Sequence, residues 1–140
     1  MPLHNQLLVN GYTNSALKSE TSAVEWMQSL VDSIDMKTIQ GPYASYVTKE
    51  GNRGLTCVVM IETSHIALHI WDEPTPGEIQ FDLYTCGELP IDKILKKLED
   101  ELGLFDYPMS TTRSRSAWRG ASGSGRPRAP ASTARSWSRA

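Results

Sequence analysis

The chain has 140 residues, 39% of them hydrophobic, and a formal net charge of −2. This length suits one domain with a real core and excludes two ordinary domains. No apolar run approaches the roughly 20 residues of a membrane span, and the start lacks the features of a signal peptide, so we expect a cytoplasmic protein without a membrane partner. Cys57 and Cys86 are the only cysteines, too few for a disulfide framework or a cysteine-based metal cluster.

Charge divides the chain into two parts. Residues 1–110 hold all 16 acidic residues, whereas residues 111–140 hold seven Arg and no acid. The second part is rich in Ser, Gly, Ala and Pro, so we expect a domain over residues 1–110 and a disordered basic tail over residues 111–140. Clustered Arg can contact phosphates, but the tail shows no repeat or aromatic interleaving, and nucleic-acid binding is not expected.

The sequence of the first half of the domain predicts a strand, a helix and a second strand. His4–Gly11 is a short strand candidate that ends at an Asn-Gly turn signal. A helix follows, because apolar residues recur every three or four positions and Ser19 or Thr21 supplies an N-terminal cap. Its apolar stripe consists of Trp26, Met27, Leu30, Val31 and Ile34. A Gly-Pro pair then opens a strand over residues 41–48.

The second half predicts three strands and a helix. Leu55–Glu62 is rich in β-branched residues, Ser64–Trp71 follows almost without a break, and residues 79–86 alternate apolar and polar side chains. After Pro90, an apolar stripe predicts a helix that ends at Gly103. This order favours an α+β fold, a two-layer α/β sandwich in which two helices cover one face of an antiparallel sheet.

The predicted strand Ser64–Trp71 places two imidazoles and an indole on one side. Strand side chains alternate between the two faces of a sheet, so its Ile and Leu residues point toward a core. His65, His69 and Trp71 point the opposite way. This polar and aromatic face therefore needs a partner or a ligand.

Two runs of the sequence carry a resemblance to a known family. The first is GLTCVVMIETSHIALHIWDE, residues 54–73, and the second is FDLYTCGE, residues 81–88. With the opening LHNQLLVNGY they resemble the prokaryotic S-adenosylmethionine decarboxylases, whose pattern is close to G-x-S-G-x-x-x-I-x-E-S-H-I-S-I-H-T-W-P-E followed by D-x-x-T-C-G. The resemblance covers roughly residues 3–107.

The resemblance implies a proenzyme that makes its own cofactor. Ser64 would attack the carbonyl of Thr63, the ester so formed would undergo β-elimination, and the chain would break between these two residues. The new end would be a pyruvoyl group, which forms a Schiff base with the substrate amine and serves as an electron sink, so neither pyridoxal phosphate nor a metal is expected. The implied reaction converts S-adenosylmethionine to its decarboxylated form and CO2, for spermidine and polyamine biosynthesis.

The same resemblance assigns the other site residues. His69 would be the base of the elimination, Cys86 the acid that reprotonates the substrate carbon, and Thr56 a hydroxyl that assists processing. Trp71 and Glu73 would line the nucleoside pocket, the indole by packing and the carboxylate by accepting hydrogen bonds from the ribose. Two sheet faces would meet in a homodimer, with the active sites near the interface.

Departures from the family pattern leave alternatives open. Thr63 stands where the family has Glu, Asp72 replaces a Pro, and the family's C-terminal strand is expected to be lost to the basic tail. A β-branched residue at the scissile carbonyl is bulky near the backbone, so one alternative is an unprocessed homologue that binds a nucleoside or a protein. The added acid weakly supports a more cationic substrate, and another alternative is a pyruvoyl decarboxylase of arginine or ornithine.

The spacing of His65 and His69 does not bring both to one metal ion.

Overall fold

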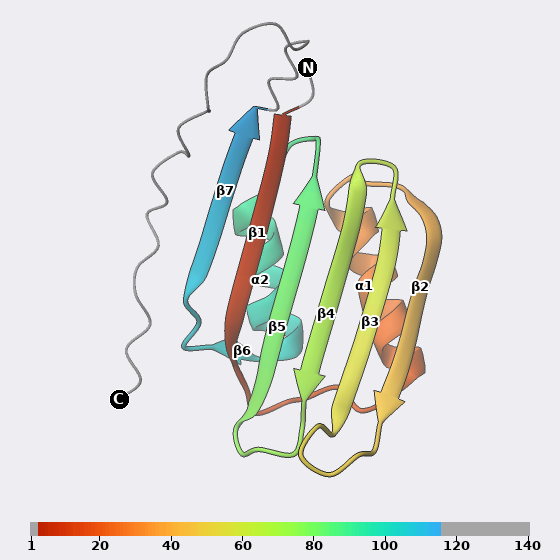
Figure 1. Cartoon of the computed structure of the whole chain (residues 1–140), viewed down its shortest axis with the longest axis vertical. Helices are drawn as coiled ribbons and strands as arrows, with labels where there is room; N and C mark the ends of the chain where they lie inside the picture. The colour runs from red at the N-terminus through yellow and green to blue at the C-terminus, as the bar shows by residue number, and fades with distance from the viewer. Residues whose placement is uncertain (1–2, 116–140) are drawn as a thin grey trace, which may run out of the picture.

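Seven strands and two helices account for most of residues 3–115, the part of the chain that the computed structural model describes (Figure 1). In chain order they are β1 (Leu3–Thr13), α1 (Glu20–Ser33), β2 (Thr38–Val47), β3 (Gly54–Ile61), β4 (Ser64–Trp71), β5 (Gly77–Thr85), α2 (Ile91–Leu102), β6 (Leu104–Phe105) and β7 (Met109–Arg115). Most of the predicted basic tail, residues 116–140, falls outside the described residues.

The strands form one antiparallel sheet with both helices on the same face. Its order is β2-β3-β4-β5-β1-β6, and β7 also pairs with β1. Figure 1 shows α1 behind β3 and β4, and α2 behind β1 and β5. The predicted two-layer α+β sandwich is thereby confirmed. Neither helix in this part of the chain is long and apolar enough to cross a membrane.

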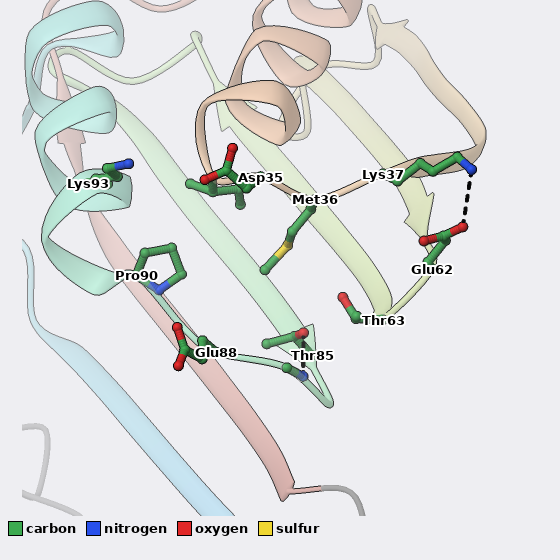
Figure 2. Close-up of a pocket in the computed structure, with 11 residues that line it drawn as sticks. Asp35, Met36, Lys37, Glu62, Thr63, Thr85, Glu88, Pro90 and Lys93 are labelled. Carbon is green, nitrogen blue, oxygen red and sulfur yellow. Dashed lines mark hydrogen bonds and ion pairs between the residues drawn. The ribbon is translucent and has the colours of Figure 1, made fainter.

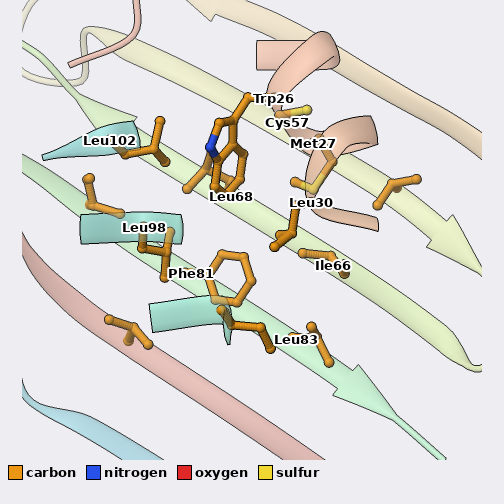
Figure 3. Close-up of a cluster of buried hydrophobic side chains, with 14 of the residues drawn as sticks. Trp26, Met27, Leu30, Cys57, Ile66, Leu68, Phe81, Leu83, Leu98 and Leu102 are labelled. Carbon is orange, nitrogen blue, oxygen red and sulfur yellow. The ribbon is translucent and has the colours of Figure 1, made fainter. Parts of the chain in front are cut away.

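Local signals in the sequence determine the ends of both helices. The Ser19 hydroxyl accepts a hydrogen bond of 3.3 Å from the Ser22 amide, which caps α1. Gly103 ends α2 in the left-handed conformation, with φ of 64°. The apolar stripes of the helices then pack on strand side chains such as Leu68 and Phe81, both almost fully buried (Figure 3). Burying one such side chain stabilises the fold by about 1.5–3 kcal/mol, so this face is the main source of stability.

The predicted turn at Asn10 and Gly11 is wrong, because β1 continues through both residues to Thr13. A Cβ atom on Gly11 would come within 2.7 Å of side-chain atoms of Leu104 and Tyr107. The glycine therefore lets the segment after α2 approach the backbone of β1 closely, instead of reversing the chain.

The predicted end of the ordered part at residue 110 also needs correction. Residues 111–115, expected in the disordered tail, belong to β7, which pairs with β1 from Leu3 to Val9. A C-terminal strand, expected to be lost, is therefore present and covers an edge of β1. Its Ser, Thr and Arg residues lack the apolar alternation that predicts a strand. The strand can form without this pattern because main-chain hydrogen bonds alone can hold an edge strand.

The sheet face opposite the helices, which we call the open face, is uncovered in the single chain. It carries exposed large apolar side chains on four strands, including Leu8, Tyr43, Val58 and Met60. Met60 lies opposite His65 of β4 in the sheet register, and the alternation of β4 places both of its imidazoles on this face. Exposed apolar side chains gathered on one face indicate an interface.

Candidate active site

The turn between β3 and β4 carries the predicted cleavage position. Ser64 is the first residue of β4 and lies opposite Thr85 of β5 in the sheet register. The amide of Cys86 donates a hydrogen bond of 3.0 Å to the carbonyl oxygen of Thr63. The structure thus brings together Thr63, Ser64 and Cys86, which we call the cleavage group.

Two features of the cleavage group favour attack on the Thr63 carbonyl. The Cys86 N–H points at the oxygen that would become negatively charged if a nucleophile added to this carbonyl, and a fixed donor there stabilises that charge. Ser64 has φ of 147°, a conformation that residues with a side chain rarely adopt. Strain of this kind raises the energy of the intact chain relative to a cleaved one.

A cavity of about 430 Å³ lies on the helix side of the cleavage group. Figure 2 shows Thr63 and Thr85 on one side of it, with Asp35 and Lys93 on the side of the helices. Thr63 Oγ1 is buried there and has no hydrogen-bond partner among the described residues. The cavity therefore separates the turn from the neighbouring ends of the two helices.

Thr56 and His69 form a second group, which we call the histidine pair, in the middle of the open face. They lie opposite one another in the β3–β4 register, and Thr56 Oγ1 is 3.0 Å from His69 Nδ1. The imidazole also stacks on Trp71, with ring centroids 5.9 Å apart. When Nδ1 carries the ring proton and donates to the hydroxyl, Nε2 is left as a base.

The structure does not bring His69 to the cleavage group within one chain. Ser64 and His69 are five residues apart on β4, which corresponds to about 17 Å along a strand. A general base must lie within hydrogen-bond reach of the proton that it removes, directly or through one water. The predicted set of Ser64, His69 and Cys86 is therefore divided between two places on the chain.

Trp71 and Glu73 line a separate cavity of about 420 Å³ at the far end of β4. The Trp71 indole donates a hydrogen bond of 3.0 Å to Asn52, and a Glu73 carboxylate oxygen accepts one of 2.8 Å from the Gly51 amide. Both side chains are thereby tied to the turn between β2 and β3. The cavity presents an indole and an exposed carboxylate to a ligand, but it too is remote from Ser64 in the same chain.

Asp72 is not available to a cationic substrate, contrary to the expectation from its place in the motif. Its side chain is 2% exposed and accepts hydrogen bonds of 2.8 Å from Arg53 Nε and 2.6 Å from the Tyr46 hydroxyl. Burial alone would raise the pKa of the carboxyl, but the bonds from Tyr46 and Arg53 and the Arg53 charge outweigh it and lower the pKa. The weak support for an arginine or ornithine substrate is therefore lost.

Replacement of this buried carboxylate tests its structural role. We expect Asp72→Asn to lower the free energy of unfolding at pH 7 by about 1–3 kcal/mol, because Arg53 loses its charged partner. The lowered pKa means that the carboxylate stabilises the fold above the unfolded pKa of about 3.9, and this contribution is lost as the pH falls through the folded value. Urea unfolding of both proteins across this pH range measures the difference.

Tyr46→Phe is the matched variant, since it removes one hydrogen bond and keeps the ion pair. We expect this variant to lose less stability than Asp72→Asn, because the Arg53–Asp72 ion pair remains. Equal stability of Asp72→Asn and the parent at pH 7 would contradict the structural role.

A column of stacked rings beside the cleavage group was not predicted from the sequence. Tyr84 stacks between His4 and His65, with centroid distances of 5.5 and 5.7 Å. The Tyr84 hydroxyl is also 2.5 Å from His4 Nδ1. The alternation of β5 indicates that Tyr84 lies on the open face. Nothing in the sequence pattern indicates its contact with His4, which is 80 positions away.

Both cysteines are free thiols in different surroundings. Cys57 is buried in the core beneath α1, and burial raises the pKa of its thiol to about 11, which leaves it protonated and unreactive. Cys86 is only partly buried, as a group that meets a ligand must be. Within residues 3–115, no cluster of three or more His, Cys, Asp or Glu side chains is arranged to hold a metal ion.

The fold and the site together define a class of α+β proteins. In this chain the open antiparallel sheet carries a strained serine turn, a threonine–histidine pair and a partly buried free cysteine. The family model described as S-adenosylmethionine decarboxylase matches residues 5–115. The chain belongs to the S-adenosylmethionine decarboxylase family.

Similar proteins agree with this assignment. The S-adenosylmethionine decarboxylase proenzyme of Thermococcus onnurineus (strain NA1) is 39% identical over 61 residues, 40% of this chain and 42% of that protein. The proenzyme of Pyrococcus horikoshii is 44% identical over 45 residues, 32% of this chain and 31% of that protein. The alignments thus span less than half of these relatives. The crystal structure of the adenosylmethionine decarboxylase from Aquifex aeolicus vf5 shares the fold, with a TM-score of 0.64, 21% identity, and coverage of 87% of this chain and 98% of that one.

Proposed function

We propose that this chain is a self-processing, pyruvoyl-dependent S-adenosylmethionine decarboxylase. The observation that carries the proposal is the cleavage group, in which the Cys86 amide donates to the Thr63 carbonyl beside a strained Ser64. Membership of the family supports it, as do the names of the aligned relatives, which are proenzymes.

The processing reaction needs only the chain and water. Ser64 Oγ bonds to the Thr63 carbonyl carbon, the C–N bond between the two residues breaks, and the hydroxyl proton passes to the released nitrogen, which leaves an ester. A base then removes the Cα proton of Ser64 as the Cβ–Oγ bond breaks and Thr63 leaves as a carboxylate. Tautomerisation of the resulting dehydroalanine to an imine, addition of water and loss of ammonia complete the pyruvoyl group.

Decarboxylation would use the same end of β4. Once formed from Ser64, the pyruvoyl carbonyl supplies an electron sink for the loss of CO2 from the substrate. We assign Cys86 to return a proton to the substrate carbon, because the sheet register holds its backbone beside Ser64. Trp71 and Glu73 are assigned to the nucleoside, and the product would serve spermidine and polyamine biosynthesis.

We assign the active form to a homodimer, because the site is incomplete in one chain. A two-fold axis between two open faces, crossing the strands near Ala67, would place the cleavage group of one protomer opposite the histidine pair of its partner. The Trp71 and Glu73 cavity would come closer to the partner's Ser64 for the same reason. Exposed side chains such as Met60, at 51% exposure, would be buried in the same step.

We place the protein in the cytoplasm. The assigned proton donor, Cys86, must remain a thiol, and both cysteines are free. A reducing compartment maintains thiols in that state.

Incubation of the purified protein with carboxyl-labelled S-adenosylmethionine tests the proposal. We expect labelled CO2 only from protein that has separated into two fragments, with masses corresponding to cleavage between Thr63 and Ser64. Labelled arginine and ornithine are the competing substrates, and CO2 from either of them alone would assign a different decarboxylase activity. An intact chain that binds the nucleoside without releasing CO2 would favour an unprocessed binding protein.

A further inference from the structure

The turn that carries Cys86 is held by two side chains with no part in the reaction described above. Thr85, at 0% exposure, accepts a hydrogen bond of 3.0 Å from the Gly87 amide through Oγ1 (Figure 2). Asn5 of β1 donates a hydrogen bond of 2.8 Å from Nδ2 to the Gly87 carbonyl oxygen. The backbone amide and carbonyl oxygen of Gly87, the residue after Cys86, are therefore each held by a side-chain hydrogen bond.

These two bonds fix the two peptide groups that directly follow the Cys86 amide. The strand β5 ends at Thr85, so the regular ladder no longer constrains the peptide groups that follow. Cys86 lies between the anchored residues Thr85 and Gly87, and its amide reaches the Thr63 carbonyl from there. Loss of either anchor would let the peptide rotate and would move this N–H away from the oxygen. A hydrogen-bond donor contributes to such chemistry only when it is held in place before the charge develops.

We propose that Thr85 and Asn5 are positioning residues for self-processing. They hold the Cys86 N–H on the Thr63 carbonyl oxygen, where it stabilises the negative charge that forms as Ser64 Oγ adds to the carbonyl carbon. The inference rests on the proposed function, since the cleavage reaction is what it explains. Because the negative oxygen exists only during ester formation, loss of either anchor slows this step and not the later elimination.

The matched pair Thr85→Val and Thr85→Ser separates the hydroxyl from its packing. Valine has nearly the same shape without the acceptor, and serine keeps the acceptor with a smaller side chain. We expect Thr85→Val to slow cleavage by about tenfold to a hundredfold, below the full loss of an oxyanion donor, and Thr85→Ser to stay within about threefold of the parent. Intact-mass spectra of freshly made, folded protein over time give the rates.

Hydroxylamine at neutral pH shows which step is slowed, because under these mild conditions it cleaves esters and leaves ordinary amides intact. The fragment masses distinguish a cut after Thr63 from a cut at the hydroxylamine-sensitive Asn10–Gly11 bond. The uncleaved fraction of Thr85→Val should resist hydroxylamine, since its ester has not formed. The uncleaved fraction of His69→Ala should be cleaved by hydroxylamine, since that variant stops after the ester. A merely structural role for Thr85 would lower the melting temperature without changing the cleavage rate of folded protein.

Asn5→Asp carries the test if Thr85→Val fails to fold, because Asn5 is only partly buried. The variant replaces a donor with an acceptor facing the Gly87 oxygen, and we expect a similar slowing, with the exposed Asn14→Asp as control. A parent chain that cleaves, with folded variants that cleave equally fast, would overturn this inference alone. A parent chain that never cleaves would overturn the proposed function, and the inference with it.

Discussion

Ser64→Ala is expected to leave the chain in one piece and to abolish the release of CO2 from S-adenosylmethionine. The variant lacks the Oγ atom that forms the ester, so neither the break after Thr63 nor the pyruvoyl carbonyl can arise. Alanine carries the same Cβ atom as serine and meets the same backbone strain at this position, and we therefore expect the variant to fold as the parent does. Intact-mass spectra under denaturing conditions, after long incubation, measure cleavage, and labelled CO2 measures activity.

Ser29→Ala is a suitable control, because Ser29 is an exposed serine on α1, far in the sequence from the cleavage group. It should cleave at the parent rate. Cleavage of Ser64→Ala between residues 63 and 64 would show that another group breaks the bond, and the assigned role of Ser64 would then be wrong.

Co-expression of Ser64→Ala with His69→Ala is expected to restore cleavage that neither variant shows alone. In one chain the two residues are about 17 Å apart on β4, and in the proposed homodimer His69 would serve the Ser64 of the partner. A mixed dimer then contains one complete site, made by Ser64 of the His69→Ala chain and His69 of the Ser64→Ala chain. With random pairing of equal amounts, about half of the His69→Ala chains lie in mixed dimers and become cleavable.

The two variants differ in mass, so an intact-mass spectrum identifies which chain has been cut. Only the His69→Ala chain should give fragments. Mixed dimers that form but show no cleavage would contradict a shared site. Cleavage of His69→Ala alone at the parent rate would remove His69 from the processing reaction, where loss of a general base is expected to slow it about 10²- to 10⁴-fold.

The ends of the helices and the two faces of a strand could be predicted from the sequence residue by residue. The cap at Ser19, the stop at Gly103 and the alternation of β4 all depend on neighbours within a few positions, and the structure confirms each of them. Gly11 was misread for the opposite reason. An Asn-Gly pair by itself indicates a turn. In the structure the missing side chain of Gly11 instead makes room for Leu104 and Tyr107, which are more than 90 positions away in the sequence.

The edge strand β7 shows the same limit in another form. Edge pairing is made by backbone groups that every residue carries, so residues 111–115 gave no pattern that separates a strand from a polar tail. The charge of Asp72 likewise looked available in the sequence, and only the positions of Arg53 and Tyr46 show that it is used within the fold.

The sequence by itself determined the chemistry that is possible and the family, because residue types at set spacings are written along the chain. It also determined the apolar face that drives folding, because periodicity is a local property. Only the tertiary structure decided which of those residues meet. It joins Cys86 to Thr63, and Asn5 to Gly87, through strand pairing across many positions. It separates Ser64 from His69, because residues close in sequence on an extended strand are far apart in space.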